Sequence, residues 1–374
     1  MPEDYIITPW EVEGNINYDE LVEKFGTDEI DEELVRRIKK VAGEVHFMLR
    51  RKIFYSHRDF NWILDEYEKG NKVAMYTGRG PSGHTHVGHL MPWIFARWMQ
   101  EKLDVDLYFQ LTDDEKFLFN FDKSLDDTHS FAMENMLDII ALGFDPEKTH
   151  ILVDTEYIHN LYPLALKAAK RINFSNVKAV FGFDNSTNVG SIFYTAIQSA
   201  PCFLPTEIEG EKIPVVIPCG IDQDAHFRVT RDIAETIGYY KPALLHNKLA
   251  PSLDGSGKMS ASQPKTTIFT TDDEKQVKAK INEAFTGGKI SAQEQREEGG
   301  NPDICAVQNY RYFIFEEDDS KIEDINERCR SGDILCGECK QMLIENINSF
   351  LSKHQQKREE ARDKIDDFVM RDCD

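Results

Sequence analysis

A glycine-rich turn directly follows a strongly apolar segment early in the chain, and its residue types suit phosphate binding. It reads GRGPSG from Gly78, includes Arg79 and Gly80, and is followed within a few residues by a predicted helix. The backbone amides of such a turn and the N-terminus of a helix together attract an anion. This part of the chain therefore predicts a site for a phosphate group.

Two histidines at the start of that helix support the same interpretation. His86 and His89 are three residues apart, so they share one helix face and two imidazoles can reach the same phosphate. Gly88 lacks the side chain that would keep a flat base away from the backbone. The alternative is that the turn merely links a strand to a helix, and that the histidines are capping or core residues.

A second group of polar residues lies in a flexible stretch further along the chain. The sequence DGSG leads into Lys258, Met259 and Ser260, with Ser262 close behind. One ammonium group and two hydroxyls on a mobile loop suit closure over a polyphosphate, where Lys258 would stabilise departing pyrophosphate. The alternative is an exposed surface loop without a ligand.

The elements that must position these residues read as an α/β fold. Residues 73–77 and 107–111 form predicted strands, and residues 90–103 form a helix between them, as in a parallel crossover unit. Further short apolar runs, separated by helical patterns such as 225–237, are predicted strands at 151–153, 215–217 and 243–245. The prediction is a doubly wound parallel, Rossmann-like domain with an inserted segment over residues 71–264.

The two ends of the chain differ from this central region. Residues 1–70 read as an appended N-terminal extension with a strand-like start at 5–7 and a helical stretch at 33–41. Strand signals fade in residues 265–374, which read as a helical domain whose last helix packs back on the central region. Within 340–368, an apolar helix face is formed by Leu343, Ile347, Phe350 and Leu351.

Composition bounds the class of protein. The 374 residues carry a net charge of −22, which argues against broad nucleic-acid binding, since that binding needs many aligned cations. Any RNA contact must be local, and the candidate is the basic stretch from Lys353 to Arg358 with Arg362 and Lys364, unless that stretch is a solvated helix face. No membrane span and no signal peptide is predicted, so a cytoplasmic protein is expected.

The seven cysteines do not read as a disulfide framework. Their number is odd and only Cys336 and Cys339 have a pair spacing. A zinc site would need two further ligands beside this CxxC pair, and packing cysteines are the alternative. No metal ligands are assigned from the sequence.

The two polar groups together resemble the paired signatures of class I aminoacyl-tRNA synthetases, known as HIGH and KMSKS. The sequence HVGH begins at His86, and KMSAS begins at Lys258, 172 residues later. The family's second lysine is Ala261 here, a departure that removes half of the usual charge of the loop and keeps Lys258.

Four further strings resemble tryptophanyl-tRNA synthetases of the eukaryotic, cytoplasmic type. They are YTGRGPS from Tyr76, LTDDEK from Leu111, AIQSAP from Ala196 and IDQD from Ile221. The likeness runs from about Asp4 to the C-terminus. It implies formation of tryptophanyl-adenylate from L-tryptophan and ATP, transfer to tRNA(Trp), Mg²⁺ on the phosphates, a homodimer formed through the inserted segment, and anticodon binding by the helical domain.

The resemblance also implies the roles of individual residues. His86, His89 and Lys258 would be catalytic. The ATP site would comprise Gly78, Arg79, Gly80, His86, Gly88, His89, Thr112, Lys258, Met259 and Ser260. The tryptophan site would comprise Tyr76 and Gln110 at the indole nitrogen, and Glu115, Gln198 and Gln223 around the amino-acid head group.

Elementary chemistry supports these roles to different degrees. Tyr76 and Gln110 lie near the carboxyl ends of adjacent predicted strands, where both offer an oxygen to the indole N–H, although Tyr76 could instead be a core aromatic. Thr112 and Glu115 have the spacing of a capping box, so Glu115 could bond the helix start. Gln198 and Gln223 could be satisfied by backbone.

Three other functions remain open from the sequence. A tyrosyl-tRNA synthetase would need a carboxylate placed for the phenol, and none is evident beside Gln110. A small-molecule nucleotidyltransferase with an HxGH motif would need neither the helical domain nor the amino-acid pocket. A non-catalytic RNA-binding paralogue disagrees with the presence of His86, His89 and Lys258.

Overall fold

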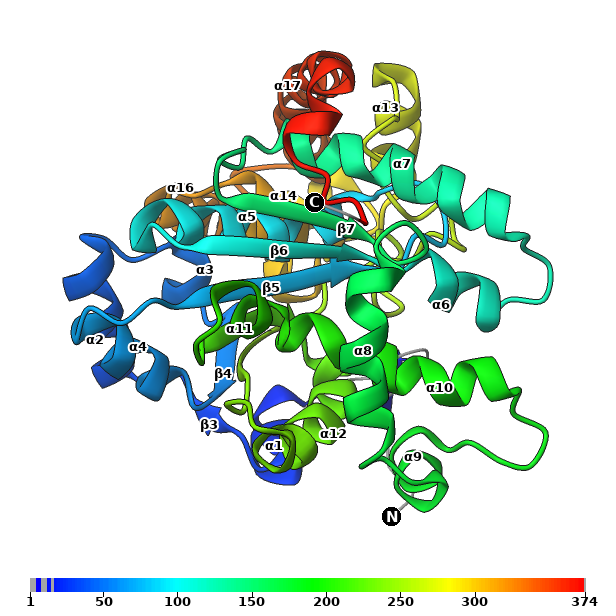
Figure 1. Cartoon of the computed structure of the whole chain (residues 1–374). Helices are drawn as coiled ribbons and strands as arrows, with labels where there is room; N and C mark the ends of the chain where they lie inside the picture. The colour runs from blue at the N-terminus through cyan, green and yellow to red at the C-terminus, as the bar shows by residue number, and fades with distance from the viewer. Residues whose placement is uncertain (1–4, 8–11, 15–16, 373–374) are drawn as a thin grey trace.

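A seven-stranded sheet forms the centre of the molecule, which we describe from a computed structural model (Figure 1). The structure describes residues 5–7, 12–14 and 17–372. The strand order is β3-β4-β9-β8-β5-β6-β7, and the five strands from β9 to β7 are parallel. The strands are β3 (Asp28–Glu29), β4 (Phe54–Arg58), β5 (Ala74–Arg79), β6 (Asp106–Leu111), β7 (Thr149–Val153), β8 (Val215–Gly220) and β9 (Ala243–Asn247).

The parallel strands confirm the predicted α/β architecture. Their near-continuous apolar runs are buried on both faces because helices cover each side of the sheet (Figure 1). Alternate residues of a strand serve the two faces: Leu107 and Phe109 pack with α5 (Val87–Leu103) and α7 (Leu125–Ala141). Tyr108 packs with α8 (Ile158–Ala169) on the other face.

The N-terminal region contributes two strands to this sheet. The strand β4 pairs antiparallel with β9, and the short β3 pairs with β4. The sequence analysis missed β4 because its segment, FYSHR, is short and half polar, so it has neither a long apolar run nor clear alternation. The predicted elements at 5–7 and 33–41 do form, as β1 (Tyr5–Ile7), paired with β2 (Val12–Gly14), and as α2 (Glu32–Ala42). Residues 1–4 lie outside the described part.

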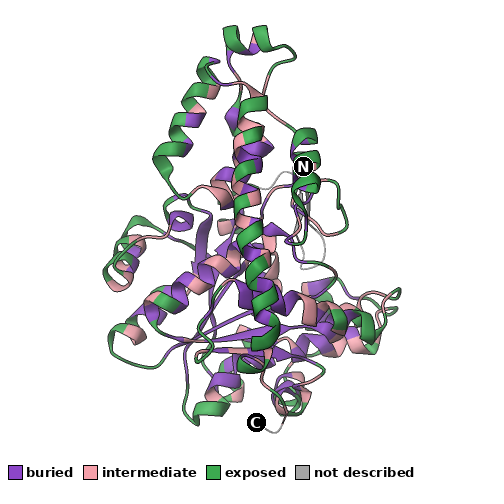
Figure 2. Cartoon of the chain, turned by 90° about the horizontal axis from the view of Figure 1, so that it is seen from above, coloured by how far each residue is buried: buried purple, intermediate pink, exposed green. Residues whose placement is uncertain are grey.

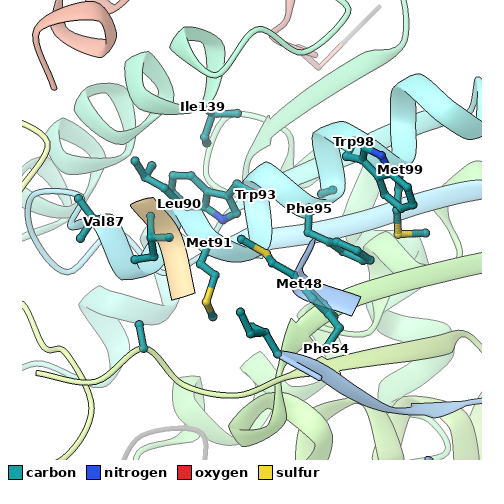
Figure 3. Packing of buried hydrophobic residues seen from close by; sticks show 14 of the residues in the cluster. Met48, Phe54, Val87, Leu90, Met91, Trp93, Phe95, Trp98, Met99 and Ile139 are labelled. Atoms are coloured by element: carbon teal, nitrogen blue, oxygen red, sulfur yellow. The ribbon is translucent and has the colours of Figure 1, made fainter. Parts of the chain in front are cut away.

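Aromatic and sulfur-containing side chains from α5 hold β4 and the neighbouring helices in place. Phe54 and Phe95 stack with ring centroids 3.8 Å apart, and Phe95 stacks on Trp98 at 5.5 Å. Figure 3 shows these rings with Met48 and Met99 in one layer of the core. Aromatic pairs of this kind add to the stabilisation that comes from burial. The helices of this region are α1 (Tyr18–Phe25), α3 (Phe47–Arg50) and α4 (Phe60–Glu68).

A buried ion pair also joins β4 to the start of α12. Arg58 donates to both oxygens of Asp224, at 2.7 and 3.0 Å, at the start of α12 (Asp224–Ala234). Burial opposes ionisation of Asp224, but hydrogen bonds from His246 and Arg58 outweigh it and lower its pKa from 3.8 to about 2. The carboxylate therefore contributes stability that is present above pH 3.8 and is lost as the pH falls through about 2.

We expect Asp224→Asn to lower the free energy of unfolding by about 2 kcal/mol at pH 7, since a pKa shift of this size is worth roughly that much. Urea unfolding measured from pH 7 down to pH 2 checks both the size and the sign. The difference in the free energy of unfolding between wild type and variant should become smaller below pH 4, because only the wild type has an Asp224 carboxylate that becomes protonated there. Asp324→Asn, in an exposed pair with Arg328, is the matched control and should change stability by less than about 1 kcal/mol.

The region after Pro264 is helical, as predicted, and no strand is assigned in residues 265–372. Its α-helices are α13 (Glu274–Glu283), α14 (Ala292–Glu298), α15 (Ala306–Tyr310), α16 (Asp319–Ser331) and α17 (Cys336–Ala361). Leu343, Ile347 and Leu351 on α17 are buried, and Phe350 is half-buried. Figure 2 shows this long helix with buried and exposed residues alternating along its length.

The last α-helix, α17, packs against α7 of the central region. His354 Nε2 lies 2.8 Å from Asp138 Oδ1, and Arg358 pairs with Asp138 and Glu134. Residues 368–370 then run beside β7, where Ile151 exchanges backbone hydrogen bonds with Phe368 and Met370.

These contacts correct the candidate RNA surface. Arg358 and His354 are buried against α7, so they cannot form an exposed basic patch with Lys353. Arg362 is exposed, but its guanidinium donates to Glu359. The basic stretch is therefore in part a structural contact between two helices, which neither proposed alternative described.

A helical segment lies between β7 and β8. Its helices are α8, α9 (Phe174–Phe181), α10 (Val189–Ile197) and α11 (Leu204–Glu209). Across residues 5–7, 12–14 and 17–372, none of the helices combines the length and the apolar character that crossing a bilayer requires.

Candidate active site

A cavity of about 300 Å³ opens at the carboxyl ends of β5, β6 and β8. That edge is where open parallel sheets bind ligands, and the volume is at the lower end for small-molecule sites. The lining includes all predicted site residues except Ser260: Tyr76, Gly78, Arg79, Gly80, His86, Gly88, His89, Gln110, Thr112, Glu115, Gln198, Gln223, Lys258 and Met259. The Ser260 hydroxyl instead lies 2.9 Å from that of Ser262.

The two histidines stack at the start of α5. Their ring centroids are 3.4 Å apart, and His89 Nδ1 accepts a hydrogen bond from the His86 backbone N–H. This bond leaves the proton of a neutral His89 on Nε2. Burial, with the nearby charges of Arg79 and Lys258, holds the pKa of both imidazoles well below the usual value. Both are therefore neutral hydrogen-bonding groups rather than cations.

Arg79 supplies a cation at the end of β5. Within the described residues, its Nε and one terminal nitrogen are buried without a hydrogen-bond partner. Burial lowers its pKa to about 10, although Glu115 and Asp138 oppose that shift, so it stays charged at neutral pH. Buried guanidinium donors without partners are costly in a folded protein, and an oxyanion such as a phosphate would satisfy them.

The loop that carries Lys258 and Met259 also lines the cavity. Lys258 Nζ lies 3.5 Å from Asp222 Oδ2, and the Met259 sulfur accepts a hydrogen bond from the Gly88 backbone N–H at 3.3 Å. A Cβ at Gly88 would lie 3.1 Å from that sulfur and 3.2 Å from Ala250 Cβ. The glycine therefore allows close contact between the two signature segments, which the sequence analysis explained only by base binding.

A chain of hydrogen bonds fixes the polar groups at the other end of the cavity. Tyr194 donates to Gln198 Oε1, and Gln198 Nε2 donates to the Tyr76 hydroxyl at 2.7 Å. Tyr76 in turn donates to Gln110 Oε1. Gln110 Nε2 donates to both oxygens of Asp154, at 2.8 and 2.9 Å. Each amide therefore has one orientation, and Gln110 presents its oxygen toward Tyr76.

Asp154 corrects an expectation from the sequence. The sequence analysis found no carboxylate beside Gln110, yet Asp154 lies there, behind the amide and outside the lining of the cavity. Burial and the neighbouring Asp114 raise the pKa of Asp154 well above its usual value. Burial also raises the pKa of Asp114, to about 7, despite hydrogen bonds that oppose the shift. Asp154 directly follows the apolar strand at 149–153, a position that could have marked it.

Glu115 lines the cavity, and its carboxylate bonds the hydroxyl of Thr112, the N-cap of α6 (Asp113–Leu118), while the Thr112 backbone N–H that a capping box would use donates to the Arg79 carbonyl. The two oxygens of Glu115 accept hydrogen bonds from the Thr112 hydroxyl at 2.8 Å and from Lys116 Nζ at 2.7 Å. Burial opposes ionisation, but Lys116 and Thr112 outweigh it and hold the pKa of Glu115 below its usual value. The site therefore contains a buried carboxylate in its charged form.

Sequence reasoning missed several polar residues of this site, among them Asp222, Lys116 and Asp154. Asp222 and Lys116 line the cavity, and Asp154 supports it from behind. Asp222 and Lys116 lie inside two of the strings that carried the family resemblance, next to residues that were assigned a role. The positions of Asp222 and Lys116 in those strings could have indicated that both residues belong to the site.

The fold and the paired signatures define the class. The family model for class I tRNA synthetases of the tryptophan and tyrosine group matches residues 68–352. Within that class, the chain belongs to the tryptophan–tRNA ligase family. It is 50% identical over 368 residues to the tryptophan–tRNA ligase of Pyrobaculum calidifontis, covering 98% of each chain. It is 50% identical over 370 residues to that of Saccharolobus solfataricus, covering 98% of this chain and 96% of the relative.

Solved structures agree with this assignment. The tryptophanyl-tRNA synthetase of Plasmodium falciparum has a TM-score of 0.89 at 40% identity, covering 94% of this chain and 97% of that one. The tryptophanyl-tRNA synthetase of Aeropyrum pernix has a TM-score of 0.87 at 32% identity, covering 96% and 97%. Relatives thus come from archaea and eukaryotes, a broader group than the eukaryotic type of the initial resemblance.

Proposed function

We propose that this chain activates L-tryptophan with ATP and transfers it to tRNA(Trp), releasing AMP and pyrophosphate. The observation that carries this proposal is one cavity with two chemically distinct ends. His86, Arg79 and Lys258 supply donors for phosphate at one end. Tyr76 and Gln110 supply oriented oxygen acceptors at the other.

The activation step needs alignment rather than a protein nucleophile. The tryptophan carboxylate attacks the α-phosphorus of ATP, a new C–O–P linkage forms, and the bond to pyrophosphate breaks. Negative charge moves onto the leaving pyrophosphate, where Lys258 on its loop stabilises it. Arg79 and the neutral imidazoles of His86 and His89 donate hydrogen bonds to the phosphates without gaining or losing a proton.

The amino acid is held by charge and by directed hydrogen bonds. The ionised Glu115 suits the α-ammonium group of tryptophan, and Gln198 and Gln223 line the cavity nearby. The indole N–H would bond Gln110 Oε1, where it would replace the long 3.5 Å hydrogen bond from Gln198 Nε2 beside the bond from Tyr76. A tyrosine phenol would bring a hydroxyl to the same place, and phenylalanine would leave the acceptors unpaired.

Transfer completes the reaction. A ribose hydroxyl at the 3′ end of tRNA attacks the carbonyl of the adenylate, and AMP leaves.

The helical domain over residues 265–374 is the candidate anticodon-binding part, and residues 71–264 form the candidate catalytic part. Mg²⁺ would bind the phosphates of ATP, and no residue of the chain is assigned as its ligand. No step is assigned to the ion.

We also propose that the chain forms a homodimer in the cytoplasm. The segment between β7 and β8, residues 154–214, carries exposed apolar side chains that a partner subunit would cover: Tyr162, Leu166, Phe174, Val189 and Ile208. Light scattering of the full chain distinguishes a dimer from a monomer.

Amino-acid-dependent pyrophosphate exchange tests the function directly. With each of the twenty amino acids in turn, we expect exchange of labelled pyrophosphate into ATP with tryptophan alone, followed by charging of tRNA(Trp). Exchange with tyrosine in place of tryptophan would assign the chain to the tyrosine branch of the class. No exchange with any amino acid would instead favour a small-molecule nucleotidyltransferase.

A further inference from the structure

Four cysteines far apart in sequence surround one small cavity in the helical domain. Cys305 precedes α15, Cys329 lies in the last turn of α16, and Cys336 and Cys339 lie in the first turn or so of α17. All four line a cavity of about 20 Å³, whose lining carries no charged side chain. The CxxC pair therefore has the two further cysteines that a thiolate site needs and that the sequence spacing alone did not reveal.

Hydrogen-bond donors around this cavity have no acceptor. Among the described residues, Gln295 Nε2, Gln308 Nε2 and Arg311 Nε are buried without a partner. Gln295 and Gln308 line the cavity and are only 3% and 8% exposed, while Arg311 donates its other nitrogen to the Cys339 carbonyl. The two buried amide donors that line the cavity, Gln295 Nε2 and Gln308 Nε2, are costly unless an acceptor occupies it, and sulfide or thiolate is such an acceptor.

The backbone leaves room for the sulfur atoms, and nearby groups would stabilise thiolates that are bound to iron. A Cβ on Gly288 would lie 2.3 Å from Cys336 Sγ, so a side chain there would displace the thiol. Cys336 and Cys339 also lie at the N-terminus of a 26-residue helix, whose dipole stabilises negative charge. Arg311, buried beside Cys339, adds a positive charge.

We propose that Cys305, Cys329, Cys336 and Cys339 bind an iron–sulfur cluster. A single tetrahedral zinc ion, with Zn–S bonds of about 2.3 Å, would need the four sulfurs to converge within about 4 Å of one another. The described residues contain no group of three or more such ligands placed to hold one ion. The cysteines surround a cavity instead of meeting at a point, as the ligands of a larger Cys₄ cluster do.

Binding of the cluster also accounts for the protons of the thiols. Each cysteine releases its proton as its sulfur bonds to iron, and iron and sulfide ions supply the rest of the cluster. The bound cluster would join Cys305, directly before α15, to the end of α16 and the start of α17.

The test is the metal and sulfide content of full-length protein purified without oxygen. We expect about four iron and four acid-labile sulfide per chain, with visible absorption from thiolate-to-iron charge transfer. Cys329→Ala and Cys336→Ala should each lose most of the iron and sulfide. Cys202→Ala, a buried cysteine in the catalytic domain, is the matched control and should keep the wild-type content.

Reconstitution keeps the test decisive if a cysteine variant folds poorly. Wild-type protein stripped of metal by a chelator should regain iron, sulfide and visible absorption when incubated anaerobically with equal amounts of ferrous and ferric iron and with sulfide. One zinc per chain in place of iron would overturn the proposal. So would wild-type protein that gains neither iron nor sulfide, or a Cys329→Ala variant that retains both.

Discussion

Replacing Lys258 with alanine is expected to slow tryptophan-dependent pyrophosphate exchange by about 100- to 1,000-fold, the usual cost of removing one donor from a site of developing charge. Lys258 lies on a loop at the cavity and, without ATP, is paired with Asp222 at 3.5 Å. Its ammonium can move from that carboxylate to the leaving pyrophosphate. Because the tryptophan end of the cavity is formed by other residues, tryptophan binding should change little.

Two measurements on purified variants check this result. Pyrophosphate exchange reports the chemical step, and titration calorimetry with tryptophan reports binding. Lys265→Ala is the matched control, since Lys265 is an exposed lysine of the same loop region that does not line the cavity. Near-normal exchange in Lys258→Ala would remove Lys258 from its catalytic role.

The signature residues and the parallel strands could be predicted because their signals are local. Each parallel strand is a run of apolar residues that reads the same way wherever it lies in the sheet, as in Leu107–Leu111 of β6. The paired motifs at His86 and Lys258 carry their own chemistry, and parallel strands bring them to one edge. The strand β4 has no such local signal, because its pairing with β9 joins residues nearly 200 positions apart.

The features that could not be predicted from the sequence depend on contacts between residues far apart in the chain. Asp154 orients Gln110 although 44 residues separate them, and Cys305 joins the cavity of the CxxC pair from another helix. The basic stretch near Arg358 was predicted to be exposed because charged side chains normally lie at the protein surface. Here the helix α7 supplies Asp138, and the cation is buried as an ion pair.

Gln110 is fixed as an acceptor because both ends of its amide are bound. Its Nε2 is held by Asp154 and its Oε1 accepts from Tyr76, so the amide cannot rotate to present its nitrogen to the ligand. Asn or Gln side chains without such partners can present either group. This arrangement gives the pocket an acceptor for an N–H donor such as the indole of tryptophan.

Gln110→Ala should therefore raise the KM for tryptophan and leave that for ATP unchanged. The preference for tryptophan over phenylalanine, as a ratio of kcat/KM, should fall about 10- to 100-fold, since the pocket loses one of two acceptors that phenylalanine leaves unpaired. Pyrophosphate exchange with tryptophan, tyrosine and phenylalanine measures it. Gln100→Ala, a buried glutamine bonded to Thr149 outside the cavity, is the matched control. An unchanged preference in Gln110→Ala would leave Tyr76 as the acceptor that selects the substrate.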